Sequence, residues 1–77
     1  MKKALYEQRC AALASLLRDE RKKAGLTQAK LAKKLRRPQS YVSKYERGDR
    51  RLDVIEFLEV ARAIGFDPGE MLNRLPL

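Results

Sequence analysis

The 77-residue sequence predicts a single all-α domain of five helices, which we place over residues 1–77 with a core over about residues 13–72. Apolar residues recur at intervals of three and four in successive segments, which is typical of amphipathic helices. Glycine, proline or a capping side chain separates these segments, and none of them alternates polar and apolar residues as a strand would. Seventy-seven residues are enough for one small domain and exclude a second.

The first two predicted helices are separated by a glycine. The stretch from Ala4 to Ala24 lacks proline and glycine and carries apolar residues at helical spacing. Gly25 can adopt the left-handed conformation that closes a helix, so we expect it to end the first one. Thr27 then offers its hydroxyl as the N-cap of a short second helix. The apolar stripe of that helix consists of Leu31, Ala32 and Leu35.

The third predicted helix begins at Pro38 or Gln39 and ends at Gly48. Proline disfavours a helical conformation at the residue before it but suits a first helical turn, so the second helix has to stop before this point. Val42 and Tyr45 supply one apolar edge, and most of the remaining positions are polar. We therefore expect this helix to bury one edge and to expose a face of hydrogen-bonding side chains.

The fourth and fifth predicted helices begin with similar signals. Asp53 and Glu56 have the spacing of a capping box, and Asp67 with Pro68 behind it forms a comparable start. Gly65 ends the fourth helix, which carries the densest apolar surface in the chain. The apolar residues are Val54, Ile55, Phe57, Leu58, Ala61 and Ile64 in the fourth helix, and Met71, Leu72 and Leu75 in the fifth.

Positive charge is concentrated in the first two thirds of the chain. The formal net charge is +8, with +9 on residues 1–37, +2 on residues 38–51 and −3 on residues 52–77. This asymmetry is expected when one face meets a polyanion and another meets protein, although an ordinary solvated surface is the simpler alternative. We therefore favour a nucleic acid as the partner.

Residues that other functions require are missing from the sequence. It has no histidine and only one cysteine, Cys10, so we expect no zinc site, no internal disulfide, no cofactor and no enzyme activity. The lone thiol and the charged N-terminal residues favour a cytoplasmic protein, and no apolar run reaches the ~18 residues that cross a bilayer. We interpret Cys10 as a packed side chain rather than a redox sensor.

Residues 27–48 form the segment that indicates function. A capped short helix, a tight break and a second short helix make up the helix-turn-helix pattern, in which the first helix supports the second in the DNA major groove. Spacing alone also fits a generic pair of helices. The residue types within the segment are more specific.

The segment resembles the xenobiotic-response-element (Xre) family, whose DNA-binding domains share the fold of the phage Cro and repressor proteins. The resemblance covers about residues 17–72 and rests on LTQAKLA at 26–32, QSYVSKYERG at 39–48 and the apolar fourth helix, in that order. It implies a lambda-repressor-like five-helix domain that binds double-stranded DNA.

The resemblance also implies which residues face the bases. The recognition helix corresponds to residues 39–47, and its base-contacting positions are Gln39, Ser40, Ser43 and Lys44, with Ser43 nearer the margin. Glutamine can give adenine a bidentate contact and lysine can donate to guanine.

Phosphate contacts are expected around the recognition helix. Gln28 matches a phosphate-contacting position in the family, consistent with the free N–H groups at a helix N-terminus. The other expected phosphate ligands are Lys30, Arg36, Arg37, Tyr41, Arg47 and Arg50. For Arg36 and Arg37, solvated turn charge is the alternative.

Three further expectations follow from the same comparison. Arg21 and Glu46 match positions that form an ion pair between the first and third helices, the alternative being that Glu46 faces water. Arg36 stands where the family usually has glycine, and Pro38 stands where it usually has a small capping residue. Because a non-glycine residue in a left-handed turn is strained, we expect this turn to be built differently.

We predict a sequence-specific transcriptional regulator, a repressor, that binds double-stranded DNA as a homodimer and makes no membrane contact. Two recognition helices related by a twofold axis read half-sites about 34–36 Å apart and gain the specificity that one helix lacks. The alternative is an antitoxin or adaptor that uses the same fold to hold another protein. We place the dimer contact on Phe66, Met71, Leu72 and Leu75.

Overall fold

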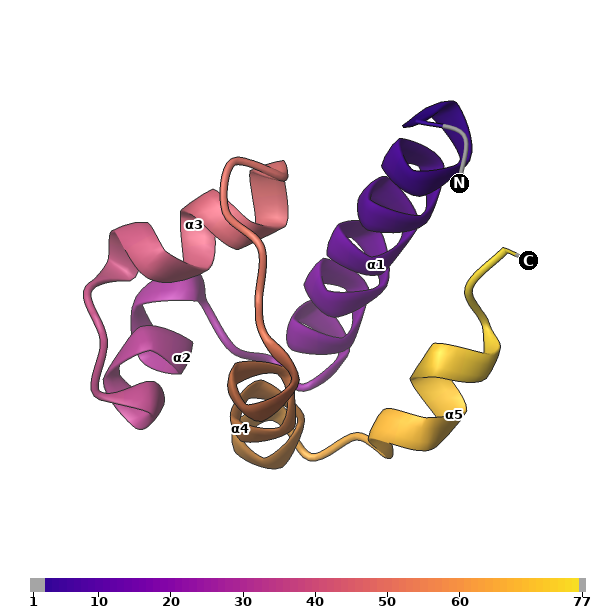
Figure 1. The fold of residues 1–77 in the computed structure, drawn as a ribbon. Helices are drawn as coiled ribbons and strands as arrows, with labels where there is room; N and C mark the ends of the chain where they lie inside the picture. The colour runs from indigo at the N-terminus through magenta and orange to yellow at the C-terminus, as the bar shows by residue number, and fades with distance from the viewer. Residues whose placement is uncertain (1–2, 77) are drawn as a thin grey trace.

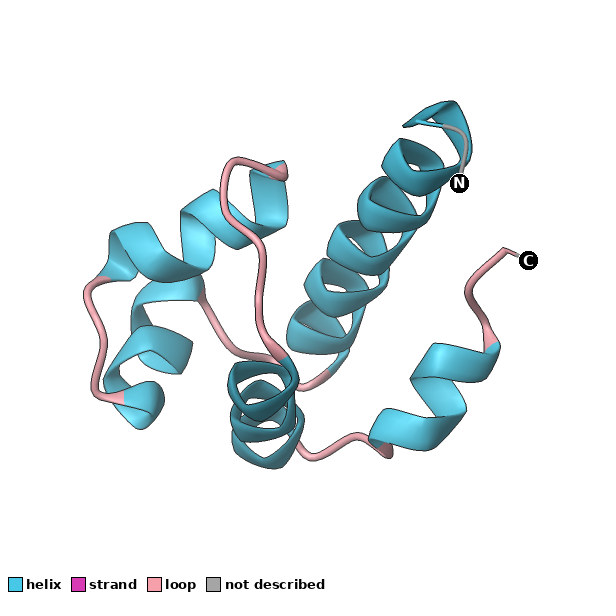
Figure 2. Cartoon of the chain, in the orientation of Figure 1, coloured by secondary structure: helices cyan, strands magenta, loops and turns pink. Residues whose placement is uncertain are grey.

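A computed structural model describes residues 3–76; Met1, Lys2 and Leu77 lie outside the described residues. Over this range the chain forms five helices and no strand, so the predicted all-α fold is confirmed (Figure 2). The helices are α1 (Lys3–Lys23), α2 (Gln28–Leu35), α3 (Gln39–Arg47), α4 (Val54–Ile64) and α5 (Pro68–Asn73).

Helix α4 packs against α2 and α5, which lie on opposite sides of it (Figure 1). The short helices α2 and α3 pack on each other, and α3 also contacts the long helix α1. As a result α3 is held from two sides while it remains at the edge of the molecule.

The core takes one fully buried side chain from each helix. Leu17, Leu31, Val42, Val60 and Met71 are each no more than 2% exposed. Burying a side chain of this size contributes about 1.5–3 kcal/mol, so the five helices stabilise one another through this shared cluster.

Side-chain caps begin three of the helices, as the sequence predicts. The Thr27 hydroxyl accepts from the backbone N–H of Lys30 at 3.1 Å, and Asp67 caps α5 in the same way. Asp53 and Glu56 form the reciprocal capping box, with distances of 2.7 and 3.0 Å. These bonds satisfy N–H groups that a helix start otherwise leaves unpaired.

The turn between α2 and α3 differs from the expectation. Arg36 itself occupies the left-handed region, with φ 57° and ψ 42°, and its N–H closes α2 on the carbonyls of Ala32 and Lys33. Pro38 is the N-cap of α3 and makes no side-chain capping bond, because its ring has no acceptor. The turn therefore keeps the shape that glycine favours, and it does so with a strained arginine.

Replacing Arg36 by glycine is expected to raise the free energy of unfolding by about 0.5–1 kcal/mol, because the relief of left-handed strain exceeds the backbone entropy that glycine adds. Urea denaturation compares this variant with Arg36→Ala, which removes the same charge but keeps Cβ. A glycine variant no more stable than the alanine variant would show that Arg36 is not strained.

Candidate nucleic-acid interface

The recognition helix α3 has one buried edge and one open flank. Its buried residues are Tyr41, Val42, Tyr45 and Glu46. Among the predicted base-contacting residues, Gln39, Ser40 and Lys44 are exposed and Ser43 is half-buried. At 100° per residue these four lie on the side of α3 opposite the core, so the structure brings them together on one surface.

The C-terminal half of α3 is locked to α1 by a buried ion pair. Arg21 donates from Nε to Glu46 Oε2 at 2.7 Å and from Nη2 to Oε1 at 3.0 Å. The two side chains are only 9% and 3% exposed, so Glu46 does not face water. Arg21 also donates to the carbonyl of Leu26 at 2.8 Å, and its hydrogen bonds with Glu46 raise the pKa of Arg21. The pair therefore joins three segments of the chain: helix α1, helix α3 and the loop that precedes α2.

Gln28 belongs to the same network. Its Nε2 donates to Glu46 Oε1 at 3.0 Å, which fixes the amide at the N-terminus of α2. An amide nitrogen carries two hydrogens, so one donor is left for a phosphate. The structure thus places the Gln28 amide against Glu46, and its phosphate contact stays a prediction.

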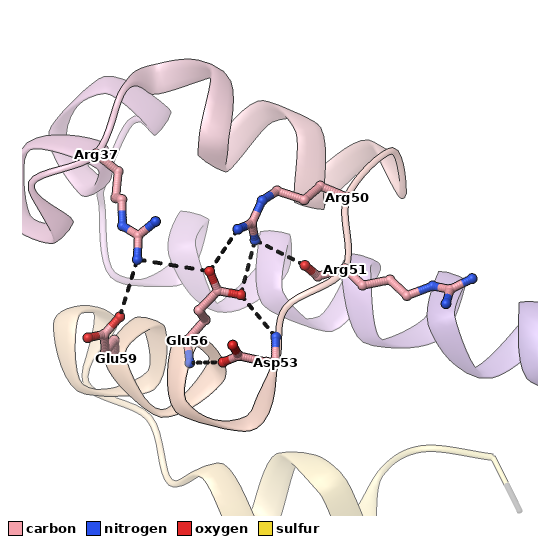
Figure 3. A network of polar contacts seen from close by, with 6 residues as sticks. All are labelled: Arg37, Arg50, Arg51, Asp53, Glu56 and Glu59. Atoms are coloured by element: carbon pink, nitrogen blue, oxygen red, sulfur yellow. Dashed lines mark hydrogen bonds and ion pairs between the residues drawn. The ribbon is translucent and has the colours of Figure 1, made fainter.

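Two of the predicted phosphate ligands are engaged inside the protein. Arg50 donates from Nη1 and Nη2 to the two carboxylate oxygens of Glu56 at 3.1 and 2.7 Å. Arg37 lies 3.9 Å from Glu56 and 3.9 Å from Glu59 (Figure 3). The hydrogen bonds from Arg50, followed by the capping bond from the backbone N–H of Asp53, lower the pKa of Glu56 to about 2, so its carboxylate stays ionised at neutral pH. In this structure Arg37 and Arg50 are thus paired with acidic side chains of the protein, and their phosphate contacts stay a prediction.

Tyr41 is likewise a packed residue rather than an open ligand. Its side chain is 7% exposed, and the guanidinium carbons of Arg37 and Arg50 lie 4.7 and 4.6 Å from the ring centroid. The ring also meets Tyr45 edge to face, and burial raises the pKa of Tyr41. Tyr41 thus gives α3 a ring face against which the guanidinium groups of Arg37 and Arg50 pack.

The remaining basic residues near α3 are accessible. Lys30 and Arg36 are exposed, and so are Lys33 and Lys34 in the last turn of α2. Arg47 makes an exposed pair with Asp49 at 3.0 Å, which contributes little and can open when a phosphate approaches.

The apolar residues at the C-terminal end separate into core and surface. Met71 is fully buried inside the chain, so its predicted place in a dimer contact is wrong; Phe66 and Leu75 are half-buried. Leu72 is 48% exposed, and α4, whose apolar surface the sequence predicts to be the densest in the chain, adds three exposed apolar side chains. We name the α4–α5 apolar surface by its members: Val54, Ile55, Leu58 and Leu72.

The spacing along α4 contained a signal for this exposure. Phe57, Val60 and Ala61 form its buried stripe at i, i+3 and i+4. At 100° per residue, Val54, Ile55 and Leu58 fall to one side of that stripe. A helical projection therefore sets Ile55 and Leu58 apart from the stripe, but Val54 projects about 20° from Ala61, and only the fold shows which group is buried.

Other kinds of site are not seen in the part of the chain that the structure describes. Residues 3–76 hold no group of three potential metal-ligating His, Cys, Asp or Glu side chains. No helix within the same range is long and apolar enough to span a membrane. Cys10 is half-buried on α1, as its interpretation as a packed side chain requires.

A short supporting helix, a tight turn and a second helix with an exposed polar flank define a helix-turn-helix DNA-binding domain. A family model described as helix-turn-helix matches residues 17–71 of the chain. A comparison with curated proteins gives no match. Solved structures give several matches.

An XRE-family like protein from Pseudomonas syringae pv. tomato is 50% identical, with a TM-score of 0.89 over 94% of this chain and 88% of that one. The restriction-modification controller protein C.AhdI from Aeromonas hydrophila is 32% identical, with a TM-score of 0.74 over 80% of this chain and 94% of that one. The clp gene regulator ClgR from Corynebacterium glutamicum is 31% identical, with a TM-score of 0.75 and 80% of each chain covered. The chain belongs to the XRE-type helix-turn-helix family and is a DNA-binding transcriptional regulator.

Proposed function

We propose that residues 1–77 form one cytoplasmic DNA-binding domain that represses transcription as a sequence-specific homodimer. The observation that supports this most directly is the polar flank of α3, which is exposed while its opposite edge is buried. Repression requires only that a bound protein occupies the promoter, and no further domain is needed for it.

Base recognition is assigned to the exposed flank of α3. Gln39 offers an amide that can donate and accept at once, and Lys44 offers a cation; such residues pair with adenine and guanine edges in the major groove. Ser40 adds a hydroxyl beside them, and the half-buried Ser43 contributes at the margin.

Phosphate contacts are assigned to Gln28, Lys30, Arg36 and Arg47. Gln28 and Lys30 lie in the first turn of α2, Arg36 precedes the recognition helix, and Arg47 is its last residue. Phosphate contacts position a protein on the duplex without reading its sequence, and they make affinity fall as salt rises.

The dimer contact is assigned to the α4–α5 apolar surface, with the half-buried Phe66 and Leu75 beside it. Its occupant is a second copy of the chain, because a twofold assembly presents two α3 helices to two half-sites. Val54 and Ile55 are 73% and 65% exposed. Neighbouring apolar side chains exposed to this degree indicate a surface that contacts another protein. The acidic residues 52–77 suit a contact that faces away from DNA.

The function is tested by fluorescence titration of random and of selected duplex DNA at two salt concentrations. We expect binding to both at low salt, a steep loss of affinity on random duplex as salt rises, and a residual preference for the selected sequence. Absence of binding to either duplex at low salt would reject the proposal and favour the antitoxin or adaptor alternative, for which the α4–α5 apolar surface would be the docking site.

The dimer is tested by sedimentation at several concentrations. We expect the unmodified protein to sediment as a dimer at micromolar concentration and Leu58→Lys to sediment as a monomer, because a buried lysine charge opposes the contact. The monomeric variant should bind the selected duplex at least about tenfold more weakly, since a single chain contacts only one of the two half-sites. Gln8→Lys, an exposed change of the same charge on α1, should alter neither property. A monomeric unmodified protein with undiminished site affinity would contradict the dimer.

A further inference from the structure

One carboxylate lies between two arginines that flank the recognition helix. Arg37 belongs to the turn just before α3, and Arg50 belongs to the loop just after it. Both reach Glu56 in the first turn of α4, Arg50 through two short hydrogen bonds and Arg37 through a longer contact (Figure 3). The side chain of Glu56 is 14% exposed, so it is well sheltered among its partners.

The recognition helix itself is part of this arrangement. The Tyr41 ring of α3 lies against both guanidinium groups at 4.6–4.7 Å. Glu56 therefore forms an ion pair with the turn before α3 and hydrogen bonds with the loop after it, and the two arginines in turn contact the Tyr41 side chain of α3. The capping box fixes Glu56 in turn to the start of α4.

The charges matter for DNA binding. Two unpaired arginines beside the recognition helix would each attract a phosphate on any duplex, because this attraction carries no sequence information. The Glu56 carboxylate makes a bidentate contact with Arg50 and lies near Arg37, so its negative charge offsets the attraction of both arginines for phosphate. Arg37 has a second acidic neighbour, Glu59, whose side chain is 56% exposed and which does not pair with Arg50.

We propose that Glu56 is a positioning residue that withholds Arg37 and Arg50 from DNA phosphates, and in this way lowers affinity for duplex of any sequence and makes that affinity less dependent on salt. The inference rests on the proposed DNA-binding function and adds to it a carboxylate of the protein that competes with the DNA phosphate for the two arginines. The strength and the salt dependence of DNA binding then depend on a residue of α4 that lies outside the helix-turn-helix itself.

The test compares Glu56→Gln with unmodified protein. Glutamine keeps an acceptor for the capping box but loses the charge that holds the arginines. We expect random duplex to be bound at least about fivefold more tightly at low salt, and the plot of log affinity against log salt to steepen by about 1–2 units per chain, since each added phosphate contact contributes about 0.9. The selected duplex should gain affinity by about the same factor, because a phosphate contact carries no sequence information. Glu59→Gln is the matched control and should change the slope by less than about half as much.

A second pair of variants carries Arg50→Gln with and without the change at Glu56. In the unmodified background Arg50→Gln should leave the salt slope unchanged, whereas in the Glu56→Gln background it should remove about one unit. A Glu56→Gln protein with unchanged slope and random-duplex affinity would overturn this inference alone, and so would an Arg50→Gln protein with a reduced slope in the unmodified background. Unmodified protein that binds no duplex would overturn the proposed function, and this inference with it.

Discussion

Replacing Arg21 by alanine is expected to lower the free energy of unfolding by about 3–5 kcal/mol, the cost of leaving one member of a buried ion pair without its partner. Glu46 would keep its charge with 3% of its side chain exposed and only the Gln28 amide to hydrogen-bond it. The carbonyl of Leu26 would lose its donor as well. A chain of this length has a total stability of about 4–12 kcal/mol, so the variant should be partly unfolded at 37 °C.

Chemical denaturation measures this loss, with Lys23→Ala as the control. Lys23 is on the same helix and pairs with Glu20 at 3.4 Å, but its side chain is 68% exposed, so its loss should cost less than about 1 kcal/mol. The double variant Arg21→Met with Glu46→Leu should recover part of the lost free energy of unfolding, because an apolar pair leaves no buried charge. A double-mutant cycle with the two single variants measures this recovery. Equal effects of Arg21→Ala and Lys23→Ala would disprove a structural role for the buried pair.

Replacing Gln39 or Lys44 by alanine is expected to weaken binding to the selected duplex by about 1–3 kcal/mol per half-site, or roughly 5- to 150-fold. Both side chains are exposed on the open flank of α3, so neither substitution removes core packing. Because a homodimer presents each residue twice, the loss on a complete operator should approach twice this free energy. Binding to random duplex should change much less.

Titration of both duplexes at matched salt concentration separates base reading from charge. Lys30→Ala is the control: it should weaken both duplexes alike and reduce the salt slope by about one unit per chain, as loss of a phosphate contact does. If Lys44→Ala weakened both duplexes equally, Lys44 would be a phosphate ligand and not a base-reading residue. The same result for Gln39→Ala would move base recognition elsewhere on the protein.

The fold was largely predictable because its signals are local. The caps at Thr27 and Asp53 and the helix-ending Gly48 act on residues within one turn, so neighbouring positions in the sequence suffice to place helix ends. The order of five helices, the helix-turn-helix and the open flank of α3 follow from such signals and from the periodicity of the apolar residues. Arg36 is the exception, since a left-handed arginine is held by the packing of α2 against α3.

The candidate site was predictable only in part, because charge in a sequence does not show where the charge is used. Arg37, Arg47 and Arg50 look equivalent along the chain, yet Arg50 is bound to Glu56 six residues away and Arg37 meets Glu56 nineteen residues away. Glu56 was predictable as a helix cap from its spacing to Asp53. Its second role depends on where the loop after α3 passes over α4, which no local pattern specifies.

Local signals in the amino-acid sequence suffice for the helices, their ends, the basic character of residues 1–51 and the polar flank that begins at Gln39. The packing of the helices is needed to learn that Met71 is buried, that Val54 and Ile55 are exposed, and that two arginines pair with one carboxylate. The physical reason is range: capping and periodicity act within a few residues, whereas burial and ion pairing depend on which distant segments meet in space.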